Sequence, residues 1–130
     1  MNDVDPELVD LATKVFGLAR SGAADDLAAY VDAGVPVNLT NDKGDSLLML
    51  AAYHGHADSV AMLLARGADP NLANDKGQTP LAGAVFKNEI AVVRALVGGG
   101  ADPNAGQPTA VDAARMFGKS DLLDLFGAQG

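Results

Sequence analysis

The chain has 130 residues, of which 48% are hydrophobic but only 5% are aromatic, and it contains no Trp and no Cys. This length suits one compact domain or a short repeat array with a core of Leu, Val and Ala, and the lack of Cys excludes disulfides and thiolate metal sites. The formal net charge of −8 repels phosphate backbones and anionic membrane surfaces. We therefore expect neither a nucleic acid nor a membrane as a partner. The same negative charge would also serve solubility alone.

The N-terminal segment does not have the pattern of a signal peptide, which needs a basic start and an unbroken apolar run. Acidic residues stand in those places, namely Asp3, Asp5, Glu7 and Asp10. No apolar stretch further along reaches the length of a membrane span. We therefore expect a cytoplasmic protein.

A long helix is predicted first, from Pro6 to about Ser21, with Asp5 as its N-cap. Proline is favoured at the first helical position, and an aspartate side chain can cap the free N–H groups there. Apolar residues recur along this segment at helical spacing; they are Leu8, Leu11, Ala12, Val15, Leu18 and Ala19. That stripe is expected to face the core.

A second helix is predicted from about Ala24 to Ala33, burying Leu27, Tyr30 and Val31. Gly34 follows it and can take the left-handed conformation that ends many helices. These two helices form the first unit of the chain.

The next two units repeat each other, with their turn motifs in the same places. Asn41-Asp42-Lys43-Gly44 returns as Asn74-Asp75-Lys76-Gly77, and Gly67-Ala68-Asp69-Pro70-Asn71 returns as Gly100-Ala101-Asp102-Pro103-Asn104. Self-similarity at this constant period indicates a stacked-repeat architecture. Helices are predicted in these units at Leu47 to His54, Ala57 to Ala65, Pro80 to Lys87 and Glu89 to Val97.

The last unit is shorter. Relative to the earlier units, a few residues are missing between Asn104 and Pro108. A helix predicted near Lys119 to Phe126 closes the stack, and residues 128–130 are expected to fray.

At these repeated motifs the chain resembles the ankyrin-repeat family. The family pattern is D-x-x-G-x-T-P-L-H-x-A-A-x-x-G-H, then an amphipathic helix, then L-L-x-x-G-A-D-x-N. The matching segments are Gly77-Gln78-Thr79-Pro80-Leu81, Ala51-Ala52-Tyr53-His54-Gly55-His56 and Leu63-Leu64-Ala65-Arg66-Gly67-Ala68-Asp69-Pro70-Asn71. Departures also occur: Ser46-Leu47 replaces Thr-Pro, and Met49 and Ala82 stand where the family has His.

The resemblance implies an all-α ankyrin-repeat solenoid of about four helix-turn-helix units with short β-hairpin fingers. Residues 1–130 would form a single domain with units at about 6–40, 41–73, 74–106 and 107–127, the first and last acting as caps.

The chain offers little for catalysis, so we expect no enzyme activity, no cofactor and no metal. His54 and His56 are the only histidines, and two residues apart on a helix they would point in different directions. Asn41-Asp42-Lys43-Gly44-Asp45 faintly resembles a calcium loop, but Lys43 interrupts it and no Glu stands at the required distance. No Ser-His-Asp or Cys-His arrangement has local support.

The resemblance also implies a binding surface, because in ankyrin-repeat proteins the finger tips and the first helix of each unit line a concave face where partners bind. Carried over position by position, its residues are Arg20 and Ser21; Asp42, Lys43, Asp45, Tyr53 and His54; Asp75, Lys76, Gln78, Phe86 and Lys87; and Met116 and Phe117. Exposed aromatic side chains at matching positions of successive repeats are suited to anchoring a partner.

Several readings of these residues remain open. Tyr53 and Phe86 are expected to be exposed, whereas Phe117 would either be exposed or pack into the C-terminal cap. The carboxylates of the fingers would form an acidic rim for a basic partner or simply be solvated loops.

We expect a monomeric protein–protein interaction module, acting as an adaptor, inhibitor or regulatory subunit. One alternative is a self-associating structural protein joined through Leu122, Leu125 and Phe126 of the terminal unit. A second alternative is a small-ligand or metal binder at His54, His56 and Tyr53.

Overall fold

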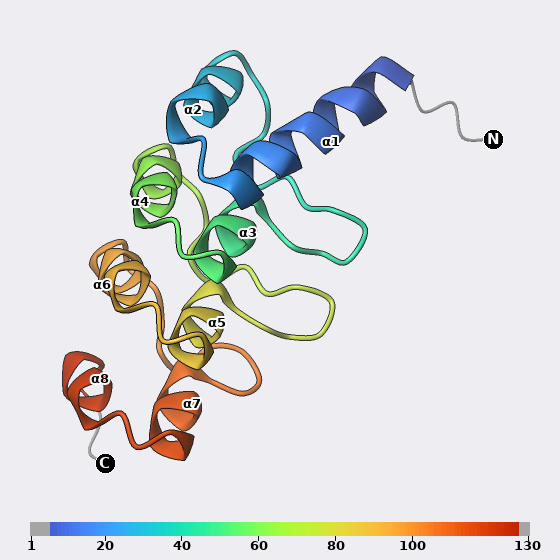
Figure 1. Cartoon of the computed structure of the whole chain (residues 1–130). Coiled ribbons are helices and arrows are strands. Elements are labelled where there is room, and N and C mark those ends of the chain that lie inside the picture. Colours follow the sequence, from blue (N-terminus) through green and yellow to red (C-terminus); the bar gives the residue numbers. More distant parts are fainter. Residues whose placement is uncertain (1–5, 128–130) are drawn as a thin grey trace.

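The computed structural model describes residues 6–127, so the predicted N-cap at Asp5 and the predicted fraying of residues 128–130 lie outside it. The described residues form eight helices in four helix-turn-helix pairs that stack side by side (Figure 1). The helices are α1 (Pro6–Ser21), α2 (Ala24–Asp32), α3 (Leu47–Tyr53), α4 (Ala57–Ala65), α5 (Pro80–Phe86), α6 (Ile90–Gly98), α7 (Ala110–Met116) and α8 (Ser120–Leu125). Each helix whose bounds were predicted begins and ends within one residue of them.

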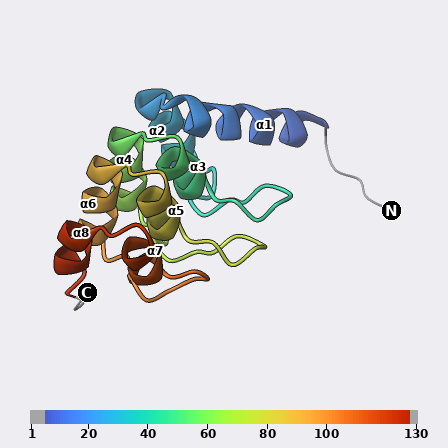
Figure 2. The ribbon, with the colours of Figure 1, turned by 60° about the horizontal axis from the view of Figure 1, so that its bottom comes forward.

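The stack has two layers. The first helices of the pairs, α1, α3, α5 and α7, form an inner layer, and α2, α4, α6 and α8 form an outer one (Figure 1). The loops between pairs leave the stack on the side of the inner layer as three fingers (Figure 2). The third loop, at residues 99–109, is shorter than the loops at residues 33–46 and 66–79, as the predicted deletion requires.

Side-chain caps fix where the inner helices begin. The hydroxyl oxygens of Ser46, Thr79 and Thr109 accept hydrogen bonds from the backbone N–H three residues later, at 3.0, 3.2 and 3.0 Å. Each bond satisfies an N–H group that would otherwise lack a partner in the first helical turn. In α5 the cap is followed by Pro80 at the start of the helix, where the missing N–H costs nothing.

The core lies between the layers and between neighbouring pairs, and it consists largely of Leu, Val and Ala, as the composition predicts. The largest apolar side chains that are almost fully buried are Leu27, Leu47, Leu48, Leu63, Leu81, Leu96, Val15, Val60, Val85, Val92 and Val93. Small residues of the inner helices, including Ala51, Ala52, Ala84 and Ala114, are fully buried. They allow neighbouring helices to approach closely, so each pair contributes one side of its neighbour's core.

The start of α1 corrects one expectation. Leu8 was predicted to face the core, but 60% of it is exposed, and Val9 beside it is 47% exposed. The reason is the length of α1, which has 16 residues where α3 has 7. Its N-terminal half therefore extends beyond α3 on the side of the fingers (Figure 2).

The expected hairpin fingers are present as turns with very little strand pairing. Among the described residues the pairing is one isolated antiparallel bridge, between Thr40 and Ser46. Asparagine side chains order the tips instead: Asn41 Oδ1 accepts from two backbone N–H groups of its own finger at 2.9 Å, and Asn74 Oδ1 does the same at 3.0 Å. Such side-chain bonds replace ladder bonds in tight turns.

An ion pair ties the outer layer together between the first two units. Arg66 Nε lies 2.9 Å from Asp32 Oδ1, and Arg66 Nη2 donates to the other carboxylate oxygen at 3.1 Å. The hydrogen bonds from Arg66 lower the pKa of the Asp32 carboxyl below its ordinary value. The pair is solvent-exposed, so its effect on stability is small.

We predict that Leu48→Ala lowers the free energy of unfolding by about 2–5 kcal/mol, because Leu48 is 1% exposed and truncation leaves a cavity in the core. Leu8→Ala is the matched control, since the same atoms are removed from a side chain that is already mostly in water. Urea denaturation measures both, and equal losses for the two variants would contradict this account of the core.

The Asp32–Arg66 pair predicts a small dependence of stability on pH. A carboxyl whose pKa is lower in the folded state contributes stability above its unfolded pKa and loses it as the pH falls through its folded pKa. The small destabilisation by Asp32→Asn at pH 7 should therefore disappear as the pH falls well below about 4. In an Arg66→Gln background Asp32→Asn should have no effect, and an undiminished effect there would assign the loss to another contact.

Candidate functional site

The ends of the inner helices bring the predicted aromatic residues into register. Tyr53, Phe86 and Met116 are the last residues of α3, α5 and α7. They form one row of the concave face, and they are 46%, 65% and 69% exposed. Side chains this large and this exposed form an apolar stripe on a surface where polar residues would suffice.

The residues that follow form the neighbouring row. His54, Lys87 and Phe117 are the C-caps of the same three helices. Phe117 is 44% exposed and contacts the ring of Phe86 edge to face at a centroid distance of 5.4 Å. Of its two predicted placements, the exposed one is therefore observed. Lys87 Nζ lies 4.7 Å from the centroid of the Tyr53 ring, a cation–π geometry.

The two histidines do not diverge as predicted. Their rings lie 6.4 Å apart and nearly parallel, at 24°, because the left-handed Gly55 between them (φ 80°) ends the helix. His56 Nε2 donates to the carbonyl oxygen of Arg20 at 2.7 Å and so links the first two units. His54 meets Tyr53 edge to face at 5.5 Å.

A hollow of about 240 Å³ opens beside Tyr53 and Phe86 of the first row. Small residues of α5 and α7 line it together with these exposed rings. The lining residues are Met49, Tyr53, Gln78, Ala82, Gly83, Phe86, Pro108 and Ala113. We call it the Gly83 hollow.

A second, more polar groove of about 470 Å³ runs between the first two fingers and α3. It shares Met49, Tyr53 and Gln78 with the Gly83 hollow, so the two adjoin each other. We call it the finger groove; its charged lining residues are Asp42, Lys43, Asp45, Asp75 and Lys76. Asp45 is held by the Asn74 side-chain amide, which donates to its carboxylate at 2.9 Å.

Many of the predicted surface residues thus line these two depressions, but Arg20 and Ser21 do not. Both belong to the first unit, are exposed, and line neither depression. For the Gly83 hollow, the sequence prediction missed Met49, Ala82, Gly83, Pro108 and Ala113. The substitution of the family's His by Ala82 and the glycine inside a helix were the signals that could have revealed the hollow.

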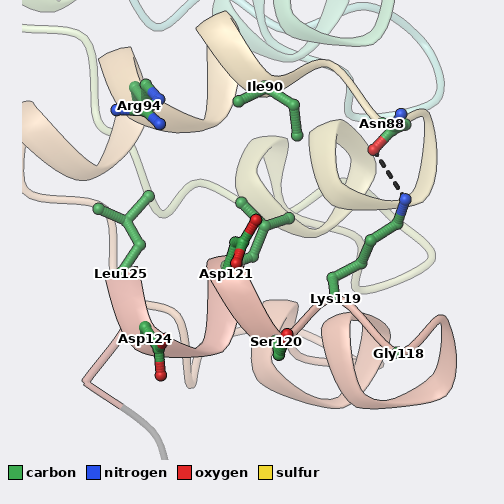
Figure 3. A pocket seen from close by; sticks show the side chains of 10 residues that line it. Asn88, Ile90, Arg94, Gly118, Lys119, Ser120, Asp121, Asp124 and Leu125 are labelled. Carbon is green, nitrogen blue, oxygen red and sulfur yellow. Dashed lines mark hydrogen bonds between the residues drawn. The ribbon is translucent and has the colours of Figure 1, made fainter.

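A larger pocket of about 580 Å³ lies elsewhere, between α6 and α8 (Figure 3). Ile90 and Leu125 line it, 37% and 39% exposed, and Lys119 Nζ donates to Asn88 Oδ1 at 2.9 Å across its edge. Leu122 and Leu125, two residues of the terminal patch considered for self-association, line this pocket. Leu122 is only 5% exposed and belongs to the core, so that part of the patch was predicted wrongly.

Within residues 6–127 no three or more His, Cys, Asp or Glu side chains gather where they could hold a metal ion. None of the helices in that range is both long enough and apolar enough to cross a membrane.

Comparison with known proteins agrees with the repeat pattern. The family model described as ankyrin repeats in three copies matches residues 16–107. An ankyrin repeat protein of Pseudomonas aeruginosa is 47% identical over 53 residues, which make up 41% of this chain and 31% of that relative. The match therefore spans less than a third of the relative's length.

The hollow predicts an unusual response to substitution. Gly83 lies inside α5, its φ is not positive, and a Cβ atom there would meet nothing within 4 Å. Gly83→Ala should raise the free energy of unfolding by about 0.5–1 kcal/mol, because glycine is the poorer residue inside a helix. Gly77→Ala, at φ 78°, is the contrasting control and should lower it. A destabilised Gly83→Ala protein in urea denaturation would show that the glycine is needed for packing.

Proposed function

This chain belongs to the ankyrin-repeat family, and we propose that it binds one partner protein through the concave face lined by α3, α5, α7 and the fingers. Ankyrin repeats are generally protein–protein interaction modules without catalytic activity. The finer assignment to an adaptor, inhibitor or regulatory subunit is part of the proposal, as is the cytoplasmic location expected from the sequence.

The observation that carries the proposal is the exposed stripe of Tyr53, Phe86, Met116 and Phe117. Large side chains with few rotatable bonds lose little entropy when a partner immobilises them, and they dominate the energy of many interfaces. The Phe86–Phe117 contact already restricts two of them in the free protein. The stripe is therefore partly ordered before binding.

The scaffold would act by rigid complementarity. Each side chain of the stripe stands at the end of a capped and buried helix, so its position is fixed by the stack rather than by a loop. A preformed surface loses little of its interaction energy to ordering. The mixed charges of the finger tips would contribute mainly to the rate and selectivity of association.

Self-association through the terminal unit is the second candidate, and the exposed Leu125 and Ile90 beside the α6–α8 pocket favour it. Sedimentation of the purified protein separates the two candidates. A monomer at all concentrations would remove self-association, whereas a concentration-dependent dimer that Leu125→Ser abolishes would support it.

We predict that the intact protein retains a partner from a lysate of its source cell and that Tyr53→Ala/Phe86→Ala loses it. Each truncation of an anchor at the centre of an interface costs about 2 kcal/mol or more of binding energy. The double variant should remain folded, because both side chains are largely exposed. Affinity capture with identification by mass spectrometry is the measurement.

The control is Leu8→Ala/Val9→Ala, which removes exposed apolar surface from α1 at residues that line neither depression. It should retain the same partner. If the Tyr53→Ala/Phe86→Ala protein also retained that partner, the concave face would not be the binding site.

A further inference from the structure

Gly83 has no structural role that requires a glycine. It lies within α5, where glycine is less favourable than alanine, and a Cβ atom would meet nothing within 4 Å. In the preceding repeat the same position is Leu50, which is only 7% exposed. The one evident consequence of Gly83 is the space above it.

That space has the dimensions of a side-chain receptor. Sites for drug-sized ligands measure roughly 300–1,000 Å³, and the Gly83 hollow measures about 240 Å³. It is lined by the small residues Ala82, Gly83 and Ala113 and by the exposed rings of Tyr53 and Phe86. An apolar cavity of this size between aromatic walls suits a single large apolar side chain, the usual anchor of an interface hot spot.

The charges around the hollow indicate which side chains would enter and which would flank it. The ammonium group of Lys87, on the Tyr53 ring, disfavours a cation inside the hollow. The adjoining finger groove holds the carboxylates of Asp42, Asp45 and Asp75 and the ammonium groups of two lysines, so its carboxylates outnumber its cations. The chain as a whole carries −8, so a cationic segment would also be attracted at long range.

We propose that the Gly83 hollow receives one Leu, Phe or Trp side chain of an extended segment of the partner, and that a Lys or Arg next to it contacts the carboxylates of the finger groove. This inference rests on the proposed function of the concave face and names the chemistry of the segment recognised there. Because the two depressions share Met49, Tyr53 and Gln78, both contacts lie within reach of one short stretch of chain.

The test uses a phage-displayed library of random short peptides, selected on the immobilised full chain. Enriched peptides should pair a large apolar residue with a nearby Lys or Arg. Fluorescence anisotropy with one such peptide should then show that Gly83→Leu weakens binding by about tenfold or more, since it fills the hollow with the residue of the preceding repeat. Gly83→Ala should give a smaller loss of the same kind, which keeps the test valid if Gly83→Leu folds poorly.

Gly17→Leu is the matched control, because Gly17 also lies inside a helix, with nothing within 4 Å of a Cβ atom, but lines neither depression. It should leave binding unchanged. Asp42→Asn/Asp75→Asn should weaken binding in low salt and remove most of the salt dependence.

The outcomes separate the two levels of the proposal. Two outcomes would overturn this inference and leave the proposed function standing. In the first, binding of the peptides depends on Tyr53 and Phe86 but does not change in either Gly83 variant. In the second, the peptides that bind contain no basic residue. Peptides that bind regardless of Tyr53→Ala/Phe86→Ala would count against the concave face itself. A selection that enriches no peptide would overturn the recognition of a short segment, whatever the lysate capture shows.

Discussion

The structure depends on apolar burial between neighbouring helix pairs. The inner helices α3 and α5, with 7 residues each, are too short to be stable alone in water, where about 12–15 residues are marginal. They persist because alanines allow close stacking and because Leu48 and Leu81 are buried almost completely. The alignment of the exposed rings follows from the regular spacing that this burial imposes.

The same regularity explains how a binding surface can be built from single residues. Because the repeats are stacked in register, residues that lie one repeat apart in the chain become neighbours in space. A substitution at one register position therefore adds or removes one element of a continuous surface. Leu50 fills its place and Gly83 leaves the equivalent place empty, so the surface varies along the stack while the scaffold does not.

Much of this was predictable from the sequence because turns and caps mark each helix. Glycine, proline and the repeat period located the helix ends to within one residue, and the same period indicated which residues share a row. Two predictions failed for different reasons. Leu8 has helical spacing but no helix opposite it, which no local pattern reveals. The orientation of the histidine pair depends on the left-handed Gly55 between them, a local signal that the helical argument left out. The Gly83 hollow is formed by residues on three helices, so no single motif could indicate its volume. The binding roles of the rings are still predictions.

The location of the concave depressions within the stack has a consequence for how the protein would unfold. A terminal pair has a stacking neighbour on one side only, so the stack should melt inward from its two ends. The Gly83 hollow and the finger groove are formed chiefly by α3, α5 and the loops beside them, which have neighbours on both sides. The proposed recognition surface thus lies on the segments that should exchange their amide hydrogens most slowly, whereas the two terminal pairs should open first.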